Sequence, residues 1–248
     1  MAKYKQDWIF GIRAVIEAIQ KGEEISKVML KQGIRGELFR QLFSLLRSCN
    51  IPFQYVSDEA FRPFAGRNHQ GVLAEVAPVR YRELNEVLDG SVGCGKVPFI
   101  LILDRITDVR NFGAVVRSAE CAGVDAVVIP TKNSAKISSD AIKTSAGAIC
   151  HLPVCRVLNL KRVVRELKYQ RGFQVYAATE KAGKFYTQVD MTLPTVVIMG
   201  SEDKGIDENL LNIVTDCIRI PQYGQIESLN VSAAAAIIMY EGRRQRGF

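Results

Sequence analysis

Apolar and polar positions alternate along the chain in a pattern that predicts short strands and helices over most of its length. In the N-terminal part, apolar residues recur at helical spacing over residues 8–20 and 37–49, which predicts two helices. The other elements expected here are strands over 25–30, 52–56 and 71–76 and a short helix that begins over 58–61. This αβαβαβ order predicts a small α/β domain in its own right.

The rest of the chain also alternates strands and helices. Residues 97–103 form a continuous apolar run, which suits a central strand that is covered on both faces. The other strands expected are 126–129, 153–157, 173–178, 195–199 and 217–220. The helices expected are one that Asn111 caps, one over 140–148, one over 160–171 and one that begins after Asn230. This alternation predicts an α/β fold with a mostly parallel sheet and helices on both faces.

A change of composition separates the two parts. Residues 79–97 contain several glycines and only one short helical piece, which is typical of a linker. We therefore expect residues 1–78 to form one domain and residues 98–248 to form a second, larger one.

The linker contains a pattern that imitates a phosphate-binding loop. Gly90, Gly95 and Lys96 have the spacing G-x-x-x-x-G-K. A functional loop of this kind needs Ser or Thr after the lysine and a helix next. Val97 and a strand follow instead, so the pattern does not predict a nucleotide site.

The composition is that of a globular protein with a surplus of basic residues. Lys and Arg outnumber Asp and Glu by 33 to 26, for a net charge of +7, and hydrophobic residues make up 48% of the chain. The surplus suits a polyanionic partner, and it suits a protein that is merely basic equally well.

Six cysteines and two histidines limit the metal and redox chemistry that the chain can carry. No CxxC pair occurs, and so few histidines argue against a zinc site. A disulfide framework is not expected in so long and apolar a chain, so the cysteines are interpreted as buried or incidental thiols of a reducing compartment. No apolar run approaches the ~20 residues of a membrane span, and the first residues lack the apolar core of a signal peptide. We expect a cytoplasmic protein without a metal.

Small and polar residues follow two of the expected strands. Residues 195–199 lead into Gly200, Ser201 and Glu202, and residues 217–220 lead into a proline and a small polar turn. Loops after the carboxyl ends of parallel strands are where open α/β sheets bind ligands. A tight turn alone would explain the same residues. No G-x-G-x-x-G motif is present, which argues against a dinucleotide as the ligand.

Two further groups of polar residues lie on or next to expected helices. Gly113, Arg117 and Glu120 share one helix face, where the guanidinium of Arg117 suits a phosphate group. An ion pair between Arg117 and Glu120 would explain the same spacing. Ser228 and Asn230 precede the last helix, where plain N-capping is sufficient to explain them. Capping is compatible with function, because a helix start also presents free N–H groups.

Three segments together resemble the signature motifs of a known family. They are LDRITDVRNFGAVVRSAECAG over 103–123, VVIMGSEDKGI over 196–206, and IRIPQYGQIESLNVSAAAAIIMYEGRRQR over 218–246. In this order and spacing they are similar to the motifs of the SpoU family, within the SPOUT superfamily of S-adenosylmethionine-dependent RNA ribose 2′-O-methyltransferases. The resemblance covers nearly all of residues 98–248. Val109 departs from it, because the family often has proline there.

The resemblance implies a fold detail, a cofactor and a site. It implies a deep trefoil knot in the C-terminal segment, a homodimer, and S-adenosyl-L-methionine bound chiefly through backbone atoms. The catalytic residues that it implies are Asn111, Arg117, Glu120, Ser228 and Asn230. The cofactor-binding residues that it implies are Thr179, Met199, Gly200, Glu202, Gly205, Ile220, Gln222, Ser228 and Leu229.

In the family, a small N-terminal domain with an H-Q-G stretch comparable to residues 69–71 resembles ribosomal RNA-binding modules and presents the substrate. Arg67 and His69 before the last strand, Arg35 in an earlier loop, and Arg117 are the residues expected to contact RNA. An ordinary loop would explain Arg67 and His69 as well. The layout most resembles bacterial enzymes that methylate a guanosine of large-subunit ribosomal RNA. The alternatives are a transfer RNA enzyme of the same family and a noncatalytic RNA-binding or ribosome-assembly protein. An oxidoreductase is disfavoured by the missing glycine motif.

Overall fold

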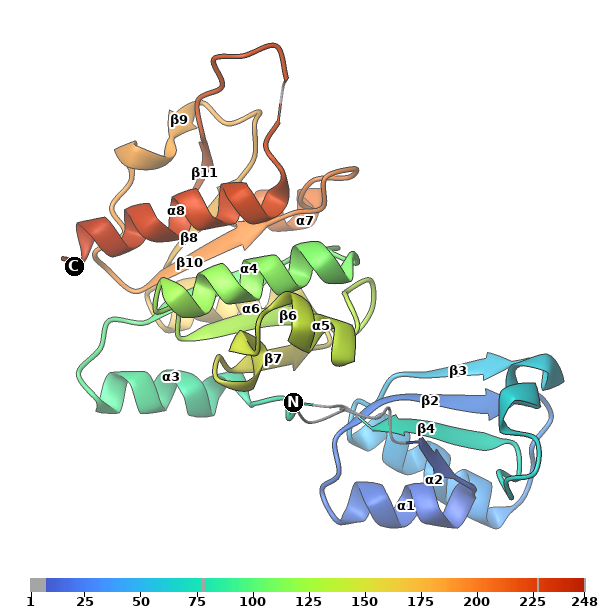
Figure 1. The fold of residues 1–248 in the computed structure, drawn as a ribbon. Coiled ribbons are helices and arrows are strands. Elements are labelled where there is room, and N and C mark those ends of the chain that lie inside the picture. The colour runs from blue at the N-terminus through green and yellow to red at the C-terminus, as the bar shows by residue number, and fades with distance from the viewer. Residues whose placement is uncertain (1–7, 77–78, 227, 248) are drawn as a thin grey trace. The chain divides into compact units, whose positions relative to one another are not determined.

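Residues 8–76, 79–226 and 228–247 are described by the computed structural model (Figure 1). The chain divides into two compact units, with the main boundary between Arg80 and Tyr81. Each unit has its own sheet and its own buried apolar cluster.

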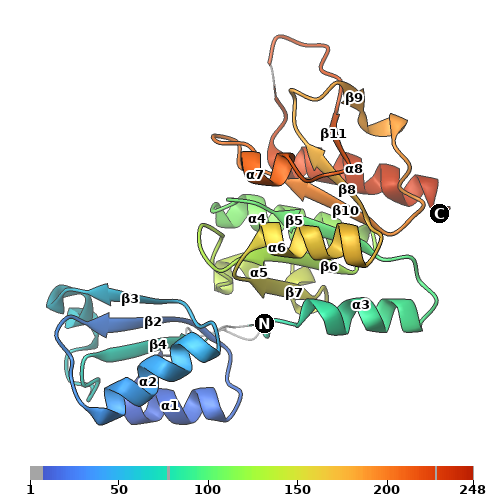
Figure 2. The same cartoon turned by 180° about the vertical axis from the view of Figure 1, so that it is seen from behind.

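The first unit is a four-stranded sheet with two helices on one side (Figures 1 and 2). β4 (Val72–Val76) is antiparallel to both β1 (Trp8–Phe10) and β2 (Ile25–Lys31), and β2 pairs in parallel with β3 (Phe53–Val56). The helices are α1 (Ile12–Gln20), α2 (Glu37–Ser48) and a 3-10 helix (Asp58–Phe64). Apolar residues of α1, α2 and the strands form one cluster, which confirms the small α/β domain expected from the sequence.

The start of this unit differs from the single helix predicted over residues 8–20. Residues 8–10 form the edge strand β1, and α1 begins only at Ile12. Gly11 lies between them with a φ of +91°, and its N–H donates to the Val72 carbonyl at 3.1 Å. A positive φ suits glycine above all, so Gly11 lets the chain turn from strand to helix. The helical spacing of the apolar residues did not reveal this interruption.

The second unit is a seven-stranded sheet in the order β7-β6-β5-β10-β8-β11-β9, and every neighbouring pair is parallel. Its strands are β5 (Phe99–Leu103), β6 (Ala126–Pro130), β7 (Val154–Val157), β8 (Gln174–Ala178), β9 (Lys184–Phe185), β10 (Thr195–Met199) and β11 (Asp216–Arg219). β5 and β10 are buried along their whole length. For β5, the continuous apolar run over residues 97–103 predicted this burial. The short strand β9 has no counterpart among the predicted elements.

Helices cover both faces of this sheet, which confirms the predicted α/β class (Figures 1 and 2). They are α3 (Leu84–Gly93), α4 (Val109–Cys121), α5 (Ser139–Thr144), α6 (Leu160–Arg165), α7 (Glu208–Leu211) and α8 (Val231–Gln245), with short 3-10 helices at Ala148–Cys150 and Tyr186–Gln188. α4 and α8 pack together on one face, and α6 lies on the other.

Three of the expected segments take a different local form. Residues 79–97, expected as a linker, contain α3, whose Leu84 and Leu88 are buried in the core cluster of the second unit. Residues 140–148, expected as one helix, form the shorter α5 and then turn at Gly147, which has a φ of +86°. Residues 160–171 begin as α6 and continue as a π-helical turn over Glu166–Gln170.

The N-terminus of α4 requires a correction. Asn111 was expected to cap this helix, but α4 begins at Val109 and its cap is Asp108. The Asp108 Oδ1 atom accepts a hydrogen bond from the backbone N–H of Asn111 at 2.7 Å. Asn111 is therefore inside the first turn, and its side chain is free for other contacts.

Replacement of Asp108 with alanine tests this cap. The change removes the acceptor for the Asn111 N–H, so we expect the free energy of unfolding to fall by about 1 kcal/mol. Thr107→Ala, one residue earlier and also exposed, is the matched control. Urea denaturation measures both variants, and a larger loss for Thr107→Ala would contradict the assignment.

The C-terminal end of α8 is fixed to the opposite edge of the sheet by Arg246. Its guanidinium donates to the carbonyl oxygens of Val97 at 2.6 Å, Met191 at 2.7 Å and Leu193 at 2.8 Å. It also lies 4.7 Å from the centroid of the Phe99 ring. One cation thus joins the last helix to the segment before β5 and to the segment before β10.

Candidate active site

The carboxylate of Glu202 joins three distant segments of the second unit. Its Oε1 atom accepts hydrogen bonds from Asn230 Nδ2 at 2.8 Å, from the Val231 N–H at 3.1 Å and from Asn111 Nδ2 at 3.3 Å. Glu202 follows β10, Asn111 lies in the first turn of α4, and Asn230 caps α8. Each of these segments follows a parallel strand, so the group lies at the carboxyl edge of the sheet, where such folds bind ligands.

The two asparagines complete this network. Asn230 Nδ2 also donates to Asn111 Oδ1 at 2.9 Å. Asn230 Oδ1 accepts from the backbone N–H of Ser232 at 2.9 Å, which confirms the predicted N-cap of α8. The negative charge of Glu202 also interacts favourably with the positive end of the α8 dipole, because it lies beside the first N–H groups of that helix. Asn111, Glu202 and Asn230 therefore hold one another in a fixed arrangement, and all three remain in contact with solvent.

Close packing of glycines shapes the loop that carries Glu202. A Cβ atom on Gly200 would lie 2.3 Å from the carbonyl carbon of Gly205, so no side chain fits there. The Gly205 N–H donates to the Ser201 carbonyl at 2.8 Å, which closes a tight turn around Glu202. The sequence suggested a tight turn and a ligand-binding loop as alternatives, and the geometry is compatible with both.

The buried carboxylate of Asp104 anchors the end of the same loop. Its Oδ2 atom accepts a hydrogen bond from the Asp207 N–H at 2.8 Å, and the Arg105 guanidinium lies against it at 3.3 Å. Asp207 in turn caps α7 through the Asn209 N–H, and this hydrogen bonding lowers the pKa of Asp207. The sequence analysis used Asp104 only as the end of a strand, so this anchoring role was missed. No local spacing reveals it, since the two residues are 103 positions apart.

Arg117 and Glu120 do not join the network. Both side chains are exposed, and within the part of the chain that the structure describes they form no ion pair with each other. At 3.6 residues per turn, they share a helix face with Gly113, whereas Asn111 is ~160° around the helix from Gly113. The Gly113 face packs on α5, because a Cβ atom there would lie 2.0 Å from Thr144 Oγ1. Asn111 and the pair Arg117 and Glu120 thus lie on the same helix, but only Asn111 takes part in the Glu202 network.

The residues expected to bind the cofactor gather around the carboxyl ends of three adjacent strands. Met199 and Ile218 both align with Ala178 of the intervening β8, and the Thr179 N–H donates to the Ile218 carbonyl at 2.9 Å. This pairing brings the backbone of Thr179, Gly200 and Ile220 to one edge. Gln222, Ser228 and Leu229 lie in the exposed segment that leads to α8. A cavity of about 570 Å³ lies along α6 and contains none of these residues.

The RNA-contacting candidates of the first unit have two kinds of environment. Arg35 and Arg67 are exposed, and the Arg67 guanidinium lies 5.6 Å from the Phe10 ring centroid. His69 is half-buried: its Nδ1 accepts from the Gly71 N–H at 3.0 Å, and its ring stacks on Phe61 at 4.7 Å. His69 thus has a clear structural role in the turn before β4, and its contact with RNA stays a prediction.

All six cysteines are free thiols, and none lies in the Glu202 network. Burial raises the pKa of Cys155 to about 12 and also raises the pKa of Cys217. Both thiols are therefore protonated near neutral pH and are poor nucleophiles. Across residues 8–76, 79–226 and 228–247, no group of three or more His, Cys, Asp or Glu residues could hold a metal ion. In the same residues, every helix is too short or too polar to cross a bilayer.

The fold and the site define a class of protein: an α/β domain with a parallel sheet and a polar ligand site at its carboxyl edge. Family models give the particular assignment. The model of the SpoU rRNA methylase family matches residues 98–240, and the model described as RNA 2′-O ribose methyltransferase substrate binding matches residues 8–82. The chain belongs to the SpoU rRNA methylase family and is an RNA 2′-O-methyltransferase, as the three motifs predicted.

Individual relatives extend this result. The chain is 33% identical over 243 residues to the putative TrmH family tRNA/rRNA methyltransferase YacO of Bacillus subtilis, with 98% of this chain and 97% of the relative covered. Among solved structures, the TrmH/SpoU tRNA modifying enzyme of A. aeolicus is 32% identical over 61% of this chain and 76% of that one, with a TM-score of 0.56. The SpoU methyltransferase AviRb of Streptomyces viridochromogenes, solved with the cofactor AdoMet, has the same fold. Its TM-score is 0.61 at 21% identity, over 97% of this chain and 90% of that one.

Proposed function

We propose that the protein transfers a methyl group from S-adenosyl-L-methionine to the ribose 2′-hydroxyl of a guanosine in large-subunit ribosomal RNA. The observation that supports this most is the Glu202 network, which joins all three family motifs at one edge of the sheet. A transfer RNA target is the alternative within the same chemistry.

The carboxyl edge fits S-adenosylmethionine in its shape and in its free groups. Gly200 and Gly205 leave no side chain over the end of β10, and the backbone of Thr179 and Ile220 lies at the ends of β8 and β11. Backbone N–H and C=O groups of this kind suit the adenine and ribose edges. Leu229, 37% exposed, offers an apolar contact beside them. The cofactor, when bound, supplies a methyl group already activated by its sulfonium.

The side chains of the network have an orienting role in this proposal. Glu202 fixes the amides of Asn111 and Asn230 before the RNA binds. Binding therefore does not carry the entropic cost of orienting them. Ser228 lies two residues before Asn230 and would complete the contacts to the target ribose. A preorganised polar group of this type stabilises the transition state more than water does.

Arg117 is proposed to position the phosphate next to the target ribose. A guanidinium stays protonated under ordinary conditions, so electrostatic positioning is favoured over removal of the 2′-hydroxyl proton. On its own chain Arg117 lies ~9 Å further along α4 than Asn111 and on another helix face. We therefore propose that Arg117 of one copy completes the site of a second copy in a homodimer.

An apolar stripe on α8 supports the homodimer. Ala233, Ile237 and Tyr240 are exposed at helical spacing, and Leu229 extends the stripe toward the site. Ile237 is 37% exposed and Tyr240 is 45% exposed, which is unusual for large side chains in the middle of a helix that also packs on α4. A second copy that packs on this stripe would lie beside the Glu202 network. The knot of the C-terminal segment and residues 1–78 as the RNA-binding domain also remain part of this proposal.

The target is tested by mapping 2′-O-methyl groups in RNA from a strain that lacks this protein. We expect one position in large-subunit ribosomal RNA to lose its methyl group, and purified protein with S-adenosylmethionine to restore it in vitro. The wild-type strain and a strain that expresses the protein from a plasmid are the controls. Loss of a methyl group in transfer RNA alone would replace the ribosomal target, and no loss in any RNA would contradict the proposal.

A further inference from the structure

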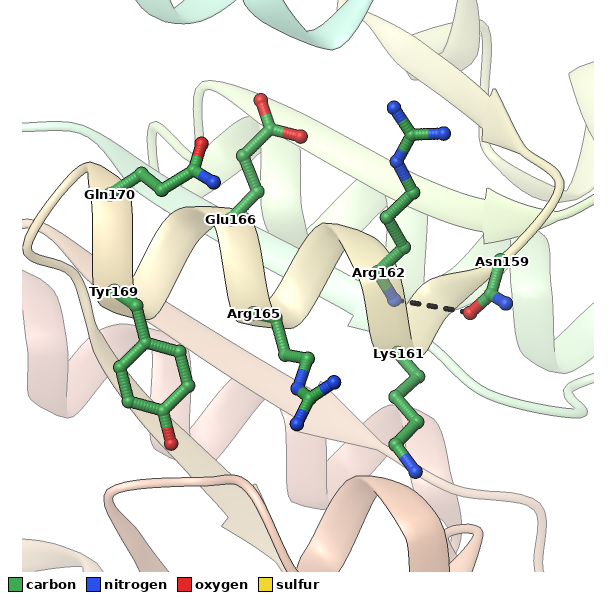
Figure 3. Close-up of a pocket in the computed structure, with 7 residues that line it drawn as sticks. All are labelled: Asn159, Lys161, Arg162, Arg165, Glu166, Tyr169 and Gln170. Atoms are coloured by element: carbon green, nitrogen blue, oxygen red, sulfur yellow. Dashed lines mark hydrogen bonds between the residues drawn. The ribbon is translucent and has the colours of Figure 1, made fainter.

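A hollow of about 570 Å³ runs along α6 and the π-helical turn that follows it (Figure 3). Seven residues line it: Asn159, Lys161, Arg162, Arg165, Glu166, Tyr169 and Gln170. Three of them are cations and one is an acid, so the hollow has a positive surplus. It lies on the face of the sheet opposite α4 and α8.

The lining side chains form two rows (Figure 3). Lys161, Arg165 and Tyr169 point to one side of the helix, whereas Arg162, Glu166 and Gln170 point to the other. Successive members of a row are four residues apart, about one helical turn. Tyr169 is 65% exposed, which is high for an aromatic side chain. One row therefore presents two cations and an exposed aromatic ring in line, with the Lys168 ammonium 5.3 Å from the centroid of that ring. The single acid lies in the other row.

The two arginines of this face have no anionic partner in the described part of the chain. Arg162 and Arg165 form no ion pair there. The Lys161 ammonium donates to the neutral Asn209 Oδ1 at 3.5 Å. Hydrogen bonding from Asn209 lowers the pKa of Asp207, and the Lys161 charge contributes to this shift without an ion pair between Lys161 and Asp207. Neighbouring cations show the contrast. Lys168 donates to the carbonyls of Ile213 and Val214, and Arg171 pairs with Asp89 at 2.9 Å. Like charges on adjacent turns repel, so this arrangement favours an external anion.

The position of the face relates it to the candidate active site. α6 follows β7 and α7 follows β10 in a parallel sheet, so both helices begin at the carboxyl edge. Asn209, which Lys161 contacts, lies in α7 immediately after the loop that carries Glu202. The row of Lys161, Arg165 and Tyr169 therefore starts beside that loop and leads away from it for ~12 Å.

We propose that this face of α6 binds the phosphate backbone of the substrate RNA outside the nucleotide that is methylated. Lys161, Arg162 and Arg165 contact phosphates, and Tyr169 stacks on an unpaired base. Guanidinium groups match the geometry of phosphate oxygens, and exposed aromatic rings beside cations are typical of single-stranded RNA sites. The proposal rests on the proposed function only in taking RNA as the partner. It adds a contact surface on the methyltransferase unit that none of the three motifs contains.

Charge and position favour RNA over an acidic protein as the occupant. The surface is continuous with the loop of the candidate active site, where the RNA has to be held for methylation in any case. Glu166 would repel phosphates from its own row, which directs the backbone along Lys161 and Arg165. A protein partner would require an apolar patch in the hollow, and Tyr169 is the one large apolar ring among its lining residues.

The double variant Arg162→Ala/Arg165→Ala tests the proposal. The probe is large-subunit ribosomal RNA from a strain that lacks the protein. We expect KM for this RNA to rise about tenfold, with kcat at saturating RNA and the affinity for S-adenosylmethionine unchanged. Loss of two phosphate contacts should also reduce the slope of log K against log salt by about 1.4. Tyr169→Leu should raise KM without changing this slope, because it removes stacking and no charge.

The matched control is Lys96→Ala/Arg243→Ala, which removes the same charge from two exposed positions, one before β5 and one in the last turn of α8. We expect its KM and its salt slope to stay within twofold of the wild type. Equal losses in the two double variants would show a general effect of net charge and would overturn the proposal. Unchanged RNA affinity in Arg162→Ala/Arg165→Ala would overturn it as well and would favour a protein partner.

The readouts separate this proposal from the function. If the wild type methylates no RNA but Arg162→Ala/Arg165→Ala still binds RNA more weakly, the proposed function is contradicted and the α6 surface is supported. If the wild type methylates its RNA fully and the variant has an unchanged KM, the proposed function is supported and the α6 surface is contradicted.

Discussion

Replacement of Glu202 with alanine is expected to lower methyl transfer about 100-fold, the effect typical of losing a preorganised polar contact at an active site. The Oε1 atom of Glu202 accepts three hydrogen bonds, from the side chains of Asn111 and Asn230 and from the Val231 N–H. Without it the Asn111 side chain keeps only its contact with Asn230 at 2.9 Å, and Asn230 keeps that contact and its bond to the Ser232 N–H. Their orientation is then no longer fixed before the substrate binds, so kcat falls more than KM rises.

The matched control for this variant is Asp203→Ala, an exposed acid one position further along the same loop. We expect Asp203→Ala to retain most of the activity, since its carboxylate takes no part in the network. Steady-state kinetics with saturating RNA measure kcat, and the thermal midpoint of each variant checks that the loop remains folded. Near-normal turnover by Glu202→Ala, with an unchanged midpoint, would remove this residue from the site.

Replacement of Arg117 with alanine is expected to abolish measurable methyl transfer and to leave the affinity for S-adenosylmethionine unchanged. The Arg117 side chain is exposed and has no partner in the described residues of its own chain, so the fold should tolerate the change. Its loss removes the group proposed to hold the phosphate beside the target ribose. Calorimetry with S-adenosylmethionine and methyl incorporation into RNA give the two readouts. Near-normal incorporation would exclude Arg117 from the mechanism.

A mixed dimer tests whether Arg117 acts on the other copy. In this proposal the Arg117→Ala homodimer is inactive, and the Glu202→Ala homodimer keeps about a hundredth of the wild-type activity. A heterodimer would combine one intact Glu202 with the intact Arg117 of its partner, which restores one site of two. Random mixing should therefore recover about a quarter of the wild-type activity, given a two-fold symmetric interface. No recovery, with dimers present, would place Arg117 and Glu202 of one chain in the same site.

The sheet of the second unit could be predicted because its central strands carry their own signal. β5 and β10 are buried on both faces, so β5 is apolar throughout and β10 is apolar after Thr195. β9, with two residues, is too short to carry such a signal, and β1 was hidden because its apolar residues continue the spacing of α1. The break between β1 and α1 depends on the positive φ of Gly11. The sequence does not reveal which φ a glycine adopts.

The candidate site could be predicted only in part. The strand-end loops at Gly200 and Ile220 indicated a ligand site, and resemblance to the family supplied the roles of Asn111 and Asn230. The central position of Glu202 was not predictable, because its hydrogen bonds join residues 28 and 91 positions apart. Helix geometry alone places Arg117 and Asn111 on different faces of α4. That the Gly113 face packs on α5 could be seen only in the structure.

The contacts of Arg246 also bear on how fast the second unit can fold. Its guanidinium bonds to the Val97 carbonyl, 149 positions away in the sequence, and to the Leu193 carbonyl, 53 positions away. Contacts between residues so far apart raise the contact order of a fold, and folding rates fall as contact order rises. The second unit is therefore expected to fold more slowly than a helical bundle of the same length.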